Sequence, residues 1–143
     1  MYLSEHFTLA EMTVSESAAR QGIDNTPNAD ALANLRRLCA FLEQVRSLFD
    51  RPILVSSGYR SAELNRVIGG SRTSAHVQGL AVDINMSGVT PRALAQRVAD
   101  SSLMFDQLIL EYDQWVHLGL STTPERRQLL TIRTGTGYLP GLV

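Results

Sequence analysis

The sequence predicts an α+β fold, in which helices pack on one side of a mainly antiparallel sheet. Helical patterns come first along the chain, and most strand patterns come later. Residues 29–48 place apolar side chains three or four positions apart, which is typical of an amphipathic helix. Residues 80–84 and 115–120 alternate between two faces with an aliphatic side on each, as half-buried strands do.

The N-terminal segment is predicted to form one helix before this long one. Thr8 can cap it, because Glu11 stands three residues later as a capping-box partner. We expect the helix to continue toward Arg20 and to end at Gly22. Residues 25–28 contain a proline and break the chain before the long helix begins.

Strands and shorter helices follow the long helix. Pro91 suits the first turn of a helix, which predicts a helix at its position. The tail, residues 133–141, holds too many glycines and prolines for regular structure. The remaining elements are expected as strands at 52–56, 105–110 and 127–132, and helices at 61–67 and 91–99.

Composition limits the function classes. A chain of 143 residues, 44% of them hydrophobic, can bury one core, and we expect a single domain over residues 1–143. A net charge of −1, from 13 basic and 14 acidic residues, argues against a dedicated nucleic-acid surface. No segment approaches the roughly 20 apolar residues of a membrane span. Cys39 has no partner for a disulfide within the chain. The sequence leaves the oligomeric state open, and we expect a monomer.

Two histidines and an aspartate stand in or beside the alternating segments. On adjacent strands, Asp83 and His117 could point at one place, and Gly79 would let the chain turn so that His76 joins them. Two imidazoles and one carboxylate leave one position of a tetrahedral zinc ion open, which is typical of catalytic sites. The alternative is that each histidine is an ordinary polar residue. His6 has no partner at a ligand spacing and is expected at the surface or in local packing.

Several motifs occur in an order that resembles a known family. Residues 74–83 read Ser-x-His-x-x-Gly-x-Ala-x-Asp, after Ser-Gly-Tyr-Arg-Ser at 57–61 and Leu-Asn at 64–65. Phe-Asp-Gln-Leu-Ile at 105–109 and Trp-Val-His at 115–117 follow. Together they resemble the zinc D-alanyl-D-alanine carboxypeptidase family, which also contains phage endolysins that cut peptidoglycan stem peptides. The likeness is to its small phage and prophage members and covers nearly the whole chain.

The resemblance implies a Zn²⁺ cofactor with His76, Asp83 and His117 as its ligands. It also implies a role for Arg60, whose guanidinium would stabilise the carbonyl oxygen or the terminal carboxylate of the substrate. An ordinary surface arginine is the alternative. Further candidate substrate-binding residues are Tyr59, Ser74 and Trp115. Tyr59 could instead form a turn, and Trp115 could equally fill core volume.

The general base departs from the pattern of many relatives, which carry an acidic residue three positions before the last histidine. Gln114 stands there and cannot accept a proton. Glu111 and Asp113 are the nearby carboxylates. We favour Glu111 as the catalytic base, because it closes the apolar run 108–110 at the end of a predicted strand. Asp113 is more typical of a turn.

We therefore expect a zinc metallopeptidase whose substrate is a peptidoglycan stem peptide, cut at a stem-peptide or cross-link bond next to a D-amino acid. Both carboxypeptidase and endopeptidase activity are compatible with the sequence. The alternative is a non-catalytic zinc-containing module that binds cell-wall peptide or another protein, which the glutamine at position 114 keeps open.

The N-terminus has neither the basic nor the apolar region of a signal peptide. We expect synthesis in the cytoplasm and action on the cell wall, in the periplasm, after holin-type release or as a virion component. A phage or prophage endolysin would have these properties.

Overall fold

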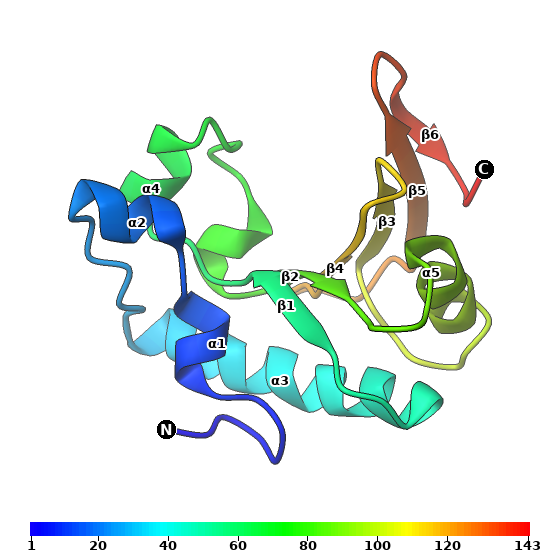
Figure 1. The fold of residues 1–143 in the computed structure, drawn as a ribbon, viewed down its shortest axis with the longest axis horizontal. Helices are drawn as coiled ribbons and strands as arrows, with labels where there is room; N and C mark the ends of the chain where they lie inside the picture. The colour runs from blue at the N-terminus through cyan, green and yellow to red at the C-terminus, as the bar shows by residue number, and fades with distance from the viewer. The chain divides into compact units, whose positions relative to one another are not determined.

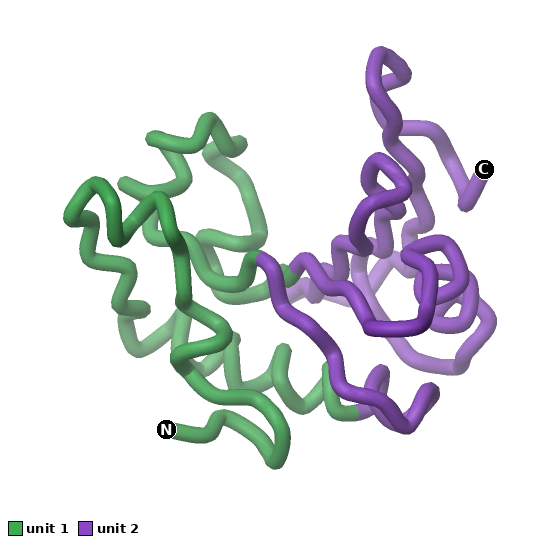
Figure 2. The backbone as a smooth tube through the Cα atoms, viewed as in Figure 1, with its two compact units in different colours: residues 1–43, 57–82 green, residues 44–56, 83–143 purple.

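The computed structural model describes all 143 residues and confirms the α+β class, with helices and a mostly antiparallel open sheet. The chain forms two compact units (Figure 2). Unit 1 comprises residues 1–43 and 57–82, and unit 2 comprises residues 44–56 and 83–143. The single domain expected over residues 1–143 stays a prediction. None of the helices combines the length and the apolar character that a membrane span requires.

Unit 1 is mainly helical (Figure 1). A capping box starts its first helix, because the Thr8 hydroxyl accepts a hydrogen bond from the Glu11 N–H and the Glu11 carboxylate accepts one from the Thr8 N–H. The helical elements of the chain up to residue 78 are α1 (Leu9–Thr13), α2 (Glu16–Gln21), α3 (Ala29–Phe49, whose last residues belong to unit 2), α4 (Ala62–Val67) and the 3₁₀ helix η1 (Ala75–Gln78).

The single N-terminal helix predicted from Thr8 toward Arg20 is wrong, because the chain forms two helices there. Val14 leaves the helical conformation with ψ 136°. The Ser15 hydroxyl then accepts a hydrogen bond from the Ala18 N–H and caps α2. A serine side chain competes with helical backbone bonds in this way, and the competition ends one helix and starts the next.

His6 packs locally, as expected. Its Nδ1 lies 2.6 Å from Oε1 of Glu43 on α3, and its backbone N–H donates to Oε2 of the same carboxylate at 2.7 Å. Ser4 Oγ also donates to that oxygen. The N-terminal segment is therefore anchored to α3 by one glutamate.

The sheet lies mostly in unit 2 and has six strands in the order β1-β2-β4-β3-β5-β6. β3 pairs antiparallel with β4 and parallel with β5, and β5 pairs antiparallel with β6. Helix α5 (Pro91–Ala99) packs on β3 and β4. The strands are β1 (Leu54–Ser57), β2 (Ala81–Asn85), β3 (Gln107–Glu111), β4 (Trp115–Gly119), β5 (Gln128–Arg133) and β6 (Gly137–Pro140).

The expectation of an irregular tail is wrong, because its residues form a hairpin with β5. Gly135 (φ 79°) and Gly137 (φ 65°) adopt left-handed conformations that glycine allows, so they turn the chain. β6 then pairs with β5, with Tyr138 opposite Ile132. The same glycines that suggested irregular structure build the turn of a hairpin.

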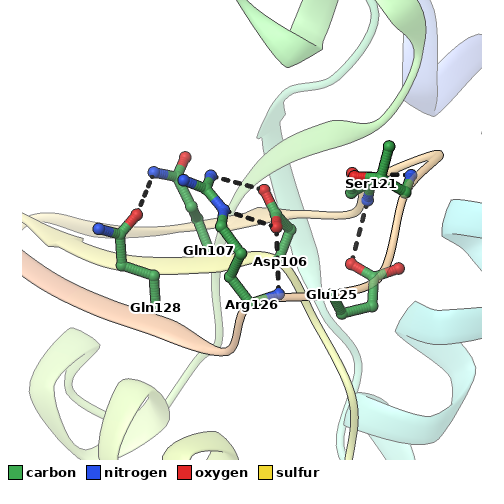
Figure 3. Close-up of polar contacts among 7 residues, drawn as sticks. Asp106, Gln107, Ser121, Glu125, Arg126 and Gln128 are labelled. Atoms are coloured by element: carbon green, nitrogen blue, oxygen red, sulfur yellow. Dashed lines mark hydrogen bonds and ion pairs between the residues drawn. The ribbon is translucent and has the colours of Figure 1, made fainter.

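A polar cluster holds the start of β5 against the start of β3 (Figure 3). Arg126 donates to both carboxylate oxygens of Asp106, from Nε at 2.9 Å and from Nη2 at 2.8 Å. These hydrogen bonds hold the pKa of Asp106 below its usual value. Gln107 also donates to the side chain of Gln128 at 2.8 Å. The cluster therefore supports the register of the parallel β3–β5 pair.

The alternation of β4 gives it two unlike faces. Val116 and Leu118 are fully buried on one face, whereas Trp115 and His117 on the other face are partly exposed. The same periodicity gives β2 its buried Val82 and Ile84. The polar face of these strands carries the side chains of the candidate site.

Candidate metal centre

In unit 1, His76 is held in a defined orientation by its own surroundings. It lies in η1, which Ser74 caps and Gly79 ends, and it is only 3% exposed. Its Nδ1 lies 2.8 Å from the carbonyl oxygen of Gly58. Because a carbonyl can only accept a hydrogen bond, Nδ1 is the donor, and in the neutral ring Nε2 is then the nitrogen available to a metal. A metal-binding histidine is usually oriented by such a second contact.

Close backbone packing fixes the two glycines beside this histidine. A Cβ on Gly58 would come within 2.4 Å of the Met12 carbonyl oxygen, and one on Gly79 within 2.6 Å of the Ala31 carbonyl oxygen. Gly79 also has φ 75°, a conformation that side chains disfavour. Only glycine fits at either position without displacing backbone.

Gly79→Ala is therefore expected to destabilise the protein. The left-handed conformation and the contact with Ala31 together should lower the free energy of unfolding by about 2 kcal/mol or more. Urea unfolding followed by circular dichroism measures the change. Gly135→Ala is a partial control, since φ is also positive there but a Cβ would meet nothing within 4 Å. Equal losses for the two variants would show that contact with Ala31 contributes nothing.

In unit 2, Asp83 and His117 lie on the neighbouring strands β2 and β4. Nδ1 of His117 is 3.0 Å from Oδ1 of Asp83. Their side chains are 16% and 12% exposed, respectively. The two ligand atoms thus face each other in a half-buried, solvent-accessible position, and nothing apolar separates them.

The three predicted ligands form one group. A ligand atom from each of His76, Asp83 and His117 lies within 4.8 Å of the other two. Two ligands of a tetrahedral zinc ion stand about 3.4 Å apart, given bond lengths near 2.1 Å. The 3.0 Å between Nδ1 of His117 and Oδ1 of Asp83 is close to this separation. The donor chemistry and the spacing therefore fit a divalent ion that accepts nitrogen and oxygen ligands.

Glu111 ends β3 beside this group. It is opposite Trp115 in the β3–β4 register, and His117 is opposite Ile109, so Glu111 and His117 are diagonal neighbours on the same face. Oε2 of Glu111 lies 4.0 Å from Nδ1 of His117, and the Glu111 side chain is 17% exposed. A carboxylate at this position can accept a proton from a water held at the metal centre.

Asp113, the alternative candidate base, and Gln114, which replaces the acidic residue of many relatives, lie in the turn between β3 and β4. The Asp113 carboxylate accepts a hydrogen bond from Arg92 on α5 at 3.2 Å and is half exposed. Gln114 is exposed, and its backbone carbonyl accepts a hydrogen bond from the Asn85 side chain. Both residues thus form hydrogen bonds that hold the turn to neighbouring segments.

The remaining predicted site residues have structural contacts of their own. The Arg60 N–H donates to the His76 carbonyl at 3.1 Å, which ties the two residues together in unit 1. Tyr59 is 7% exposed, and burial, together with the nearby Asp24 carboxylate, raises its pKa. The Ser74 hydroxyl accepts from the His76 N–H. The catalytic and substrate-binding roles of Arg60, Tyr59 and Ser74 stay predictions.

Trp115 lies next to Glu111 with its indole half-buried. Its ring centroid is 5.6 Å from that of Tyr112, at an interplanar angle of 48°. Its Nε1 is buried and has no hydrogen-bond partner in the protein. A buried donor without a partner is costly, and a bound molecule can satisfy it. Trp115 as a substrate-binding residue stays a prediction.

Sequence reasoning missed the carbonyl of Gly58 as the group that orients His76. The signal was present in the motif, because a glycine between Ser57 and Tyr59 marks a place where two segments of backbone come close. The missing information was the partner, which lies 18 residues away along the chain.

Two imidazoles, a carboxylate and an adjacent glutamate define a candidate centre for metal-assisted hydrolysis. Comparison with known proteins agrees, because the Peptidase M15 family model matches residues 5–119. The chain belongs to the peptidase M15 family, and the resemblance found in the order of its motifs is confirmed.

One characterised relative is the zinc D-Ala-D-Ala carboxypeptidase of Streptomyces albus G. The two sequences are 33% identical over 93 residues, which is 64% of this chain and 35% of that protein. The chain thus spans about a third of the length of the relative it matches.

Proposed function

We propose that this protein is a zinc-dependent peptidase that acts on peptidoglycan. Its substrate would be a stem-peptide or cross-link bond next to a D-amino acid, cut as a carboxypeptidase or an endopeptidase. The observation that carries the proposal is the Glu111 carboxylate beside the Asp83–His117 pair. Membership of the M15 family and the name of the Streptomyces relative support the choice of zinc and of a D-alanyl substrate.

The ligands in this proposal are His76, Asp83 and His117. When bound, zinc supplies a Lewis acid and lowers the pKa of water. Glu111 accepts the proton of the attacking water and delivers it to the leaving amine, in keeping with its position 4.0 Å from the His117 ring nitrogen. Arg60 meets the negative charge that develops on the carbonyl oxygen, or binds a terminal carboxylate.

A peptide-release assay tests the proposal. Purified peptidoglycan incubated with the protein and zinc should gain free amino groups, and a chelator should abolish the gain. Mass spectrometry of the products identifies the bond, because a carboxypeptidase releases single D-alanine and an endopeptidase separates cross-linked peptides. Metal-dependent binding of muropeptides without any release would instead establish the non-catalytic module that Gln114 keeps open.

We further propose that the biological role is that of a phage or prophage endolysin, made in the cytoplasm and released to the wall through a holin or carried in a virion. The support is the order of motifs shared with small phage members of the family. Bacteria that express the protein should lyse when a holin is co-expressed and stay intact without it. Lysis in neither case would overturn the holin-dependent role.

A further inference from the structure

Four residues form a row across the sheet at the level of Glu111. Glu111 pairs with Trp115 on β4 and with Ile132 on β5, and Ile132 pairs with Tyr138 on β6. Directly paired residues place their side chains on the same face of a sheet. Tyr138 therefore lies on the face that carries Glu111 and His117.

Tyr138 is within reach of this glutamate. Strands are about 4.8 Å apart, so two strand spacings separate Tyr138 from Glu111, with only the half-buried Ile132 between them. Partial burial, followed by the charges of Glu111, Tyr112 and Asp83, raises the pKa of Tyr138. The phenol thus experiences the carboxylates of the candidate centre, although 59% of the residue is exposed to solvent.

A second exposed aromatic residue follows Glu111 directly in the chain. Tyr112, 41% exposed, follows it directly and has φ 56°, a conformation that is rare for a bulky side chain. In this conformation its ring packs against Trp115. Asp113 has the same left-handed conformation, with φ 52°, and the two residues form the tight turn that joins β3 to β4. Two exposed tyrosines and the half-buried Trp115 therefore lie near the candidate base, and each offers an apolar ring with a polar group.

The part of the chain that carries Tyr138 lies beyond the family match, which ends at residue 119. The hairpin β5–β6 therefore lies outside the matched region. Its register is supported by the contacts of Asp106 with Arg126 and of Gln107 with Gln128 (Figure 3), which hold β5 on β3. A fixed register gives Tyr138 a fixed position relative to Glu111.

We propose that Tyr138 is a substrate-binding residue and that the β5–β6 hairpin forms one wall of the peptide site. This inference rests on the proposed function. The ring would pack against the methyl groups and backbone of the stem peptide, and the hydroxyl would donate a hydrogen bond to a peptide carbonyl or carboxylate. Tyr112 and Trp115, whose rings are in contact, would bind the same peptide.

The single tryptophan of the chain makes the test direct, because intrinsic indole fluorescence reports on Trp115 alone. A purified pentapeptide muropeptide is titrated into zinc-loaded protein that carries Glu111→Gln, so that binding is measured without cleavage. Tyr138→Ala and Tyr138→Phe are added to this background. Thr134→Ala is the matched control, since Thr134 is exposed in the turn of the same hairpin.

We expect Tyr138→Ala to raise the Kd about tenfold and Tyr138→Phe about threefold, the latter from loss of one hydrogen bond. Thr134→Ala should leave the Kd unchanged. With Glu111 restored, Tyr138→Ala should raise KM and leave kcat nearly as it was. Equal Kd values for Tyr138→Ala and Thr134→Ala would overturn the inference. If Tyr138→Ala does not fold, an unchanged Kd for Tyr138→Phe would overturn it.

The assay separates this inference from the proposed function. A wild-type protein that binds the muropeptide but does not cleave it would contradict the peptidase proposal. A Kd that still depends on Tyr138 in that case would sustain the role of the hairpin in binding. If the wild type and Tyr138→Ala cleave with the same KM, the peptidase proposal is supported and the proposal that the β5–β6 hairpin binds the peptide is refuted.

Discussion

Glu111→Gln is expected to abolish most turnover while the protein keeps its zinc. The amide has the size of the carboxylate but cannot accept a proton, so the change removes the base and little else. General-base catalysis contributes a factor of about 10² to 10⁴, and we expect kcat to fall by about 10³ within that range. Steady-state kinetics with a muropeptide measures the rate, and elemental analysis measures the zinc.

Asp113→Asn is the matched control for this variant. It makes the same chemical change two residues away, at a half-exposed carboxylate bound to Arg92. An exposed ion pair contributes about 1 kcal/mol or less to stability, and we expect activity to stay close to that of the wild type. Wild-type turnover in Glu111→Gln, or an equal loss in Asp113→Asn, would remove Glu111 from the role of base.

Elements with a regular spacing of apolar residues could be predicted from the sequence. Breaks and turns that depend on single hydrogen bonds or on a partner strand could not. The spacing of apolar residues located α3 to within a residue. The break at Ser15 was missed, because serine is compatible with a helix interior and only its hydrogen bond to Ala18 makes it a cap. Strand β6 was missed because Gly137 and Pro140 suggest a loop unless a partner strand is known.

The candidate site shows the same division. Strand alternation was sufficient to place Asp83 and His117 on facing positions of two strands. The orientation of His76 depends on a carbonyl from another segment. Tyr138 depends on the pairing of β6, so no local pattern could have associated it with Glu111. The side chains that were missed depend on contacts with distant segments that their own local sequence did not indicate.

His117→Ala is expected to remove zinc and activity together. It deletes one of three proposed ligands and leaves Asp83 without the ring nitrogen that lies 3.0 Å from it. A ligand set reduced to two should bind the ion far more weakly, so elemental analysis should find zinc near one ion per chain in the wild type and little in the variant. Turnover should fall with the zinc content.

The third histidine provides the control for this loss. His6→Ala removes an imidazole that contacts Glu43 and is not one of the proposed zinc ligands. The change should leave the zinc content unchanged. Zinc should also raise the melting temperature of the wild type and of His6→Ala, because an ion that binds only the folded state stabilises it by mass action. The same addition should not shift the melting temperature of His117→Ala. Full zinc binding by His117→Ala, or loss of zinc binding in His6→Ala, would refute the ligand assignment. Glu111 would then no longer lie beside a proposed metal centre, and its assignment as the catalytic base would lose its basis.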